Sequence, residues 1–177
     1  MRFCKKTRSH VWRNTINIIM ITQDDMLSME ELSTGFYVQH SQLIYESFTN
    51  NFIEFPIHFS DPLDLALKLY HAPFLVFSID NSETPKYNYL NNRAQQAFEL
   101  KRDQLNNFLL KDSVPEQLQS NLLGFTKHIQ ETGKFANYNG LRVSIHGNQF
   151  RLNNAYVWAL TSQKTYYKGV CWMEPLF

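Results

Sequence analysis

Three consecutive segments near the end of the chain are predicted strands separated by short turns, and the first two alternate apolar and polar residues. The segments are residues 141–146, 149–160 and 166–173, and Gly147 with Asn148 forms the first turn. A period of two is the side-chain spacing of a β-strand that buries one face. Strands joined by turns this short pair antiparallel with their neighbours. The sequence therefore predicts an antiparallel meander for the last third of the chain.

Two further strands are predicted upstream of the meander. Residues 74–80, FLVFSID, are apolar on both sides, and residues 86–90 are a second short strand after a turn. Five strands with helices between the second and the third describe an α+β domain. Because the first strand is apolar on both faces, it belongs in the middle of the sheet, which predicts the strand order 2-1-5-4-3.

Helix signals fill the interval between the second and third strands. Asn91 is a good cap for a helix that extends to about residue 100. Ser113 and Glu116 have the spacing of a capping box for a second helix, and Gly133 is expected to end it in the left-handed conformation. We expect the helices of residues 91–132 to cover one face of the sheet.

The first third of the chain predicts an amphipathic helix over residues 36–52, and Asp61 with Pro62 starts another. A helix with one apolar face either covers the sheet of its own chain or pairs with another subunit.

We divide the chain into a poorly ordered basic extension (1–30), an N-terminal helical segment (31–72) and a core domain (73–177). Residues 1–22 are interpreted either as a disordered basic tail or as a translation start placed too early, since methionines follow.

Charge and cysteine content exclude several classes of protein. The formal net charge is +1, which gives no reason to expect a nucleic-acid or membrane partner. No apolar run approaches the roughly 18 residues of a membrane span, and we expect a cytoplasmic protein. The two cysteines, Cys4 and Cys171, are too few for a disulfide framework or for a zinc site built from cysteines.

Four stretches of the chain resemble the MEKHLA family: HAPFLVFSID (71–80), NYLNNRAQQAFEL (88–100), NYNGLRVSIHGNQFRLNNAYVWAL (137–160) and YKGVCWM (167–173). The most specific part is the pattern G-[VL]-R-[VI]-S…F-R-[LI]-x-x-A-x-V-W, and the resemblance covers residues 36–173. MEKHLA is a PAS-like domain found in small bacterial proteins and at the C-termini of plant homeodomain-leucine-zipper transcription factors. The resemblance implies a PAS-like fold and a sensor or interaction module, with no established catalytic residues.

The sequence offers no catalytic or cofactor constellation. It lacks a nucleophile elbow, a Walker loop, an HExxH motif and a GxGxxG motif, so we expect a protein that is not an enzyme. Light-sensing flavin PAS domains use a cysteine next to an Asn on a helix, which the absence of cysteine between residues 5 and 170 excludes. Haem PAS domains use a histidine from the helix before the third strand. His128 lies there among polar residues, so we expect it at the surface and not as a haem ligand. We expect no cofactor and no metal.

Seven residues are candidates for contacting a ligand between the sheet and the helices: Phe98, Phe125, Arg142, Phe150, Asn154, Tyr156 and Trp158. Simple alternation places Phe150, Asn154 and Trp158 on one face of the fourth strand, with Asn154 as its polar member. Asn154 either contacts a ligand or is a structural residue at a β-bulge. If a bulge shifts the alternation, Arg151 and Asn153 become the candidates in place of Asn154.

Arg142 and Trp158 carry two further expectations. Arg142 alternates away from the apolar side chains of its strand. It is either an exposed strand arginine or a contact for an anion or for a salt bridge in a dimer. Trp158 is expected to be largely buried against the helix that carries Phe98 or the helix that carries Phe125.

Two functions compete at this point. The leading hypothesis is a non-enzymatic PAS-like sensor that binds a small apolar or aromatic ligand between sheet and helices and signals through a protein partner. The alternative is a ligand-free structural or homodimerising module that uses the N-terminal helix or the outer sheet face. No residue set supports an enzyme. A pocket above about 300 Å³ would favour the first function, and side chains filling that volume would favour the second.

Overall fold

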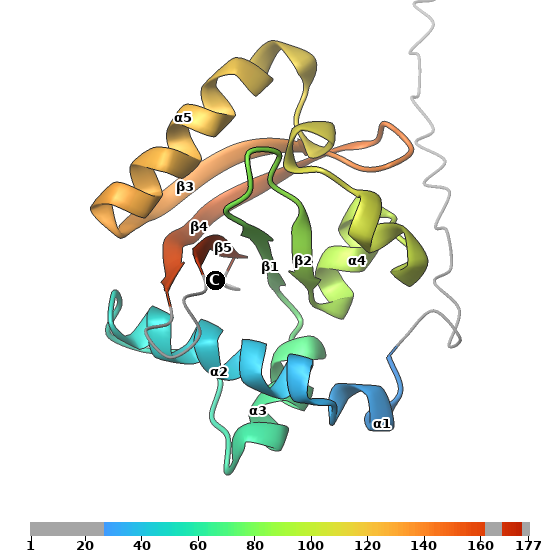
Figure 1. The fold of residues 1–177 in the computed structure, drawn as a ribbon, viewed down its shortest axis with the longest axis vertical. Coiled ribbons are helices and arrows are strands. Elements are labelled where there is room, and N and C mark those ends of the chain that lie inside the picture. Colours follow the sequence, from blue (N-terminus) through green and yellow to red (C-terminus); the bar gives the residue numbers. More distant parts are fainter. Residues whose placement is uncertain (1–26, 162–167, 175–177) are drawn as a thin grey trace, which may run out of the picture.

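A five-stranded antiparallel sheet lies at the centre of the protein in the computed structural model, which describes residues 27–161 and 168–174 (Figure 1). The prediction for the basic tail, residues 1–22, lies outside the described residues. The strand order is β2-β1-β5-β4-β3, as the sequence predicted. The strands are β1 (Leu75–Asp80), β2 (Tyr87–Leu90), β3 (Lys134–Val143), β4 (Gln149–Thr161) and β5 (Lys168–Glu174).

Helices cover both faces of this sheet. They are α1 (Met29–Leu32), α2 (Gly35–Thr49), α3 (Pro62–Tyr70), α4 (Asn92–Phe98), the 3₁₀ helices η2 (Arg102–Asn107) and η3 (Leu110–Ser113), and α5 (Glu116–Thr132). Figure 1 shows α5 on one side of the sheet and α2 with α3 on the other. We call the side under α4 and α5 the inner face and the side under α2 and α3 the outer face. The N-terminal helix α2 therefore covers the sheet of its own chain.

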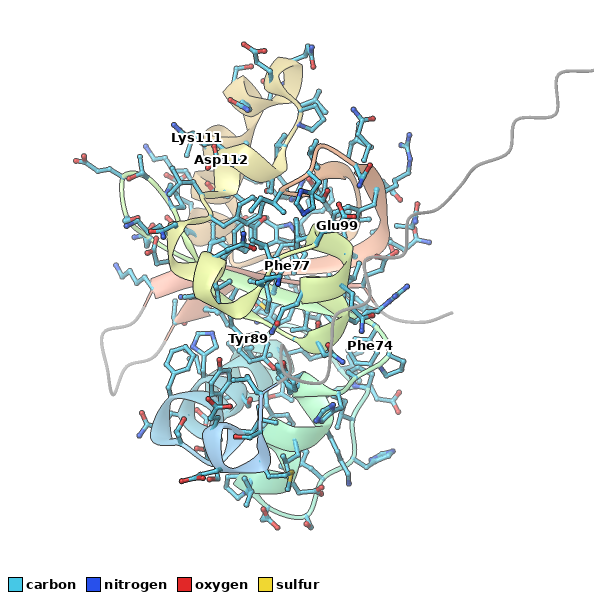
Figure 2. The ribbon with its side chains drawn as sticks, turned by 90° about the vertical axis from the view of Figure 1, so that its right-hand side faces the viewer. Phe74, Phe77, Tyr89, Glu99, Lys111 and Asp112 are labelled. Carbon is cyan, nitrogen blue, oxygen red and sulfur yellow. The ribbon has the colours of Figure 1, made fainter. Side chains whose placement is uncertain are left out.

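Each face of the sheet has its own hydrophobic core. Phe77 belongs to the inner core and Tyr89 to the outer core, and Figure 2 shows these two side chains on opposite sides of the sheet. On β5, Trp172 faces the inner core, whereas Cys171 and Met173 face the outer core. Both sides of the central strands are thus removed from water. This burial explains why the sequence of β1 is apolar throughout.

Asn91 joins three parts of the chain at the end of the sheet: α4, β1 and the connection between α3 and β1. Its side chain is fully buried, and its Oδ1 accepts hydrogen bonds from the backbone N–H groups of Val76 and Ala94, each at 3.0 Å. Its Nδ2 donates to the backbone oxygen of Phe74 at 2.7 Å. The side-chain amide of Asn91 therefore caps α4, binds the start of β1 and pairs a backbone carbonyl of the connection between α3 and β1. The helix cap predicted at this position is confirmed.

Two local predictions were wrong. β3 begins at Lys134, earlier than the predicted start at residue 141, because two register shifts between residues 135 and 140 hide its alternation. The capping box at Ser113 does not form: the cap of α5 is Pro115, without a side-chain hydrogen bond. The Ser113 hydroxyl instead donates to the backbone oxygen of Leu110 and accepts from the buried Tyr87 hydroxyl, which needs a partner.

We expect Asn91→Ala to lower the free energy of unfolding by about 3–5 kcal/mol, because it removes a helix cap and leaves buried backbone groups of two other elements unpaired. Urea denaturation measures this change. Asn92→Ala is the matched control. The Asn92 side chain accepts a hydrogen bond from Gln96 on the exposed side of α4, so its loss should lower the free energy of unfolding by no more than about 0.5 kcal/mol. Equal effects of the two substitutions would contradict this role for Asn91.

Candidate functional site

A β-bulge in β4 decides which side chains face each core. Tyr138 lies opposite Ala155 and Gly140 lies opposite Leu152, so one residue of β3 faces two residues of β4. Asn154, inside this bulge, has a left-handed backbone with φ of 51°, and its side chain is exposed. The expectation that Asn154 shares an inner face with the aromatic residues of β4 is wrong, because the extra residue shifts the alternation by one.

The bulge divides the seven candidates between the two cores. Phe98, Phe125, Arg142 and Phe150 lie on the inner face, whereas Tyr156 and Trp158 lie on the outer face. The fallback candidates Arg151 and Asn153 are exposed. The structure thus brings the first four residues to one side of the sheet and separates the other candidates from them.

Trp158 is fully buried, as expected, but against a different helix. Its ring centroid lies 5.2 Å from that of Phe48 on α2, and its Nε1 donates to the Ser47 hydroxyl at 2.9 Å. The prediction that it packs on the helix of Phe98 or of Phe125 was wrong, because the bulge turns it to the outer face. Trp158 fixes α2 on the sheet.

Arg142 is buried on the inner face, with 1% of its surface exposed. Its Nη1 donates to the Tyr138 hydroxyl at 3.1 Å and to the backbone oxygen of Leu141 at 3.3 Å. Its Cζ lies 5.5 Å from the ring centroid of Tyr138 and 5.7 Å from that of Trp172, within the range of cation–π attraction. The interpretation of Arg142 as an exposed strand arginine is therefore wrong.

Gly140 makes this arrangement possible. The ring of Tyr138 folds back over Gly140, and a Cβ at that position would collide with the ring. The ring also stacks on Phe125 of α5, with centroids 5.0 Å apart. A glycine between Tyr138 and Arg142 lets the tyrosine ring fold back and reach the arginine. Alternation of apolar and polar residues does not reveal this contact.

Three buried nitrogens on the inner face have no hydrogen-bond partner. They are Nε and Nη2 of Arg142 and the indole Nε1 of Trp172. Among the described residues the salt bridge is Lys68–Asp64 on α3, and no carboxylate pairs with Arg142. A buried guanidinium without a counter-charge costs several kcal/mol of desolvation.

Tyr87 lies beside this charge. Burial raises the pKa of Tyr87 to about 12, and the nearby positive charge of Arg142 opposes that rise. Phe77 stacks on Trp172, with centroids 5.2 Å apart and planes 15° apart. Arg142 therefore lies among aromatic rings and the hydroxyls of Tyr138 and Tyr87. We call Arg142, Trp172, Tyr138 and Tyr87 the arginine cluster.

A hollow of about 270 Å³ opens between η3, α5 and the turn after β1. Its walls include Pro85, Leu109, Leu110, Lys111, Leu122 and Leu123. Leu110 and Leu122 also belong to the inner core that contains Trp172. The hollow is slightly smaller than the roughly 300 Å³ at which small-molecule pockets begin.

The outer face contains a second buried polar group that the sequence did not single out. His40 of α2 stacks on Tyr89, and its Nε2 lies 2.8 Å from the Ser78 hydroxyl, which donates to Asn88. Since Ser78 donates onward, His40 carries its hydrogen on Nε2 and is the donor of this pair. The pair therefore lacks the arrangement in which a histidine activates a serine nucleophile.

Other candidates do not assemble into a site. His128 is exposed on α5. In the described part of the chain, no cluster of three or more His, Cys, Asp or Glu side chains could hold a metal ion. Burial raises the pKa of the Cys171 thiol, which disfavours the reactive thiolate. None of the helices within residues 27–161 is long and apolar enough to cross a bilayer.

Comparison with known proteins finds a matching domain family and similar solved structures. A family model described as the MEKHLA domain matches residues 38–175. The structure is similar to a PAS domain from Colwellia psychrerythraea, with a TM-score of 0.52, 8% identity, and coverage of 63% of this chain and 92% of that chain. A fungal LOV domain photoreceptor gives a TM-score of 0.49 at 8% identity and covers 76% of this chain and 89% of that one. The search of curated proteins found no match.

We expect His40 to make the protein less stable as the pH falls. Burial lowers the pKa of His40 from 6.5 to about 4, so the unfolded chain takes up the proton first. The contribution of His40 is therefore complete above about pH 6.5 and declines toward pH 4, with a loss of about 2 kcal/mol by pH 5. Denaturant unfolding at several pH values measures this slope.

His128→Gln is the matched control for this pH dependence, since His128 is exposed. It should leave the slope between pH 7.5 and pH 5 unchanged, whereas His40→Gln should flatten it. An unchanged slope in a folded His40→Gln protein would contradict the assignment.

Proposed function

This chain belongs to the MEKHLA domain family, and from that premise we propose that it is a PAS-like sensor that binds a small molecule on the inner face of its sheet. The observation that supports the proposal is the unpartnered polar edge of the arginine cluster. Native proteins pair the great majority of their buried polar side-chain atoms. Three unpaired nitrogens on one face form a polar edge that hydrogen-bond acceptors of a ligand could satisfy.

The surroundings of these nitrogens suit a small molecule. Ligand sites combine apolar and aromatic walls with a few oriented polar groups. The arginine cluster supplies aromatic walls and polar groups. The hollow beside η3 has apolar walls and shares Leu110 and Leu122 with the inner core, but none of the four cluster residues lines it. The hollow of about 270 Å³ falls short of the roughly 300 Å³ expected of a small-molecule pocket, so the unpaired nitrogens support this proposal and the cavity volume does not.

The sensor would transmit its state through β5. Trp172 faces the ligand side, and its neighbours Cys171 and Met173 face α2 and α3 on the outer side. A ligand that fits one arrangement of the sheet better shifts the population toward it. We propose that the resulting movement of α2 is read by a protein partner and that the domain itself catalyses no reaction.

Native mass spectrometry of the full chain, purified without denaturation, tests the proposal. We expect a non-covalent adduct that disappears under denaturing conditions. Unfolding and refolding away from the ligand should lower Tm by about 5–10 °C, if the ligand was present at about 100 times its Kd. A bare chain that assembles into dimers, with unchanged Tm after refolding, would contradict ligand binding and favour the homodimerising module.

A second measurement tests the proposed signal. Hydrogen exchange should change in α2 between adduct-bound and refolded protein, because α2 packs on the strands beside Trp172. The amides of α4 lie on the ligand side of the sheet and should change as well. Exchange that differs only on the inner face would contradict transmission to α2.

A further inference from the structure

We propose that the ligand carries a carboxylate and that Arg142 binds it through its Nε–Nη2 edge. The inference rests on the proposed function, and it adds the chemical class of the ligand. It depends on which guanidinium nitrogens are already occupied. Nη1 donates to Tyr138 and Leu141, whereas Nε and Nη2 are buried and unpartnered.

The two free nitrogens form one edge of the guanidinium. On that edge an Nε–H and an Nη2–H point in parallel, and their spacing matches the two oxygens of a carboxylate. Tyr138 and Leu141 hold the opposite side of the group, which fixes its plane before a ligand arrives.

Charge balance favours a monoanion. Arg142 contributes one positive charge, because a guanidinium is not deprotonated in proteins. No carboxylate of the described residues neutralises it. One carboxylate would cancel this charge, whereas a phosphate dianion would leave a negative charge among the rings of Tyr138 and Trp172. The site with a bound carboxylate therefore has no net buried charge, whereas the site with a bound dianion still has one and keeps its desolvation cost.

The rest of the ligand should be apolar. The ring of Trp172 lies against Arg142 and also stacks on Phe77. Its indole Nε1 is a further buried donor without a hydrogen-bond partner. None of the arginine-cluster residues lines the hollow beside η3, but its Leu110 and Leu122 belong to the same inner core as Trp172. An apolar or aromatic body lies favourably against such walls.

Benzoate and benzamide test the inference, because they share one shape and differ in charge. On the refolded full chain, we expect benzoate to raise Tm and to bind in calorimetry, and benzamide to bind about 10- to 100-fold more weakly. Inorganic phosphate is the third probe and should have little effect.

Arg142→Met removes the charge and keeps a side chain of similar length. We expect benzoate binding to weaken by about 10- to 100-fold, while Tm of the ligand-free protein stays equal or rises, because an unpaired buried charge is gone. Arg151→Met is the matched control: Arg151 is exposed on β4, and its loss should leave benzoate binding unchanged. A purely structural arginine predicts the reverse, a lower Tm and no separate binding defect.

The outcomes separate this inference from the proposed function. A neutral co-purifying adduct, or benzamide that binds as tightly as benzoate, would overturn the carboxylate and keep the sensor. Stabilisation by phosphate alone would also overturn it. If Arg142→Met does not fold, the comparison of the three probes on the unaltered protein decides. No binding of any probe together with no native adduct would overturn both proposals.

Discussion

The bulge in β4 is the constraint on which the division of the molecule into two cores depends. Side chains alternate along a strand, so one extra residue at Asn154 exchanges the faces of everything that follows. Trp158 consequently enters the outer core, where it fixes α2 through Ser47. The inner face receives smaller residues, and Val157 lies opposite Trp172. This pairing of a small residue with a large one leaves room for the arginine cluster.

The sequence predicted the sheet well because its signals were local and redundant. The strand order followed from a first strand that is apolar on both sides, and Asn91 marked the start of α4. The candidate site was predicted less well because alternation assumes an unbroken register, which the bulge at Asn154 violates. Arg142 was misjudged for a different reason: an arginine that alternates with apolar side chains on a strand is usually exposed. The Gly140 that admits the Tyr138 ring was the available signal, but it acts through space and not through periodicity.

The two faces solve the burial of polar groups in different ways. On the outer face His40 sheds its charge, since burial lowers its pKa to about 4, and the neutral ring binds Ser78. Arg142 has no such option, because a guanidinium stays protonated in proteins. It can be stabilised only by partners. The aromatic rings and Nη1 contacts provide part of that stabilisation, and the proposed carboxylate would provide the rest.

Energy also limits how such a ligand could move α2. A ligand can shift an equilibrium only by its difference in affinity for the two states, and a 100-fold preference supplies about 2.7 kcal/mol. Ile44 and Phe48 of α2 are almost completely buried against the sheet. Exposing both side chains would cost about 3–6 kcal/mol, before other contacts are counted. Release of α2 is therefore beyond the reach of a ligand of this strength. A shift of the docked helix, with its core contacts kept and the hydrogen bonds at Ser47 and His40 rearranged, lies within it, because each such bond contributes only about 1 kcal/mol.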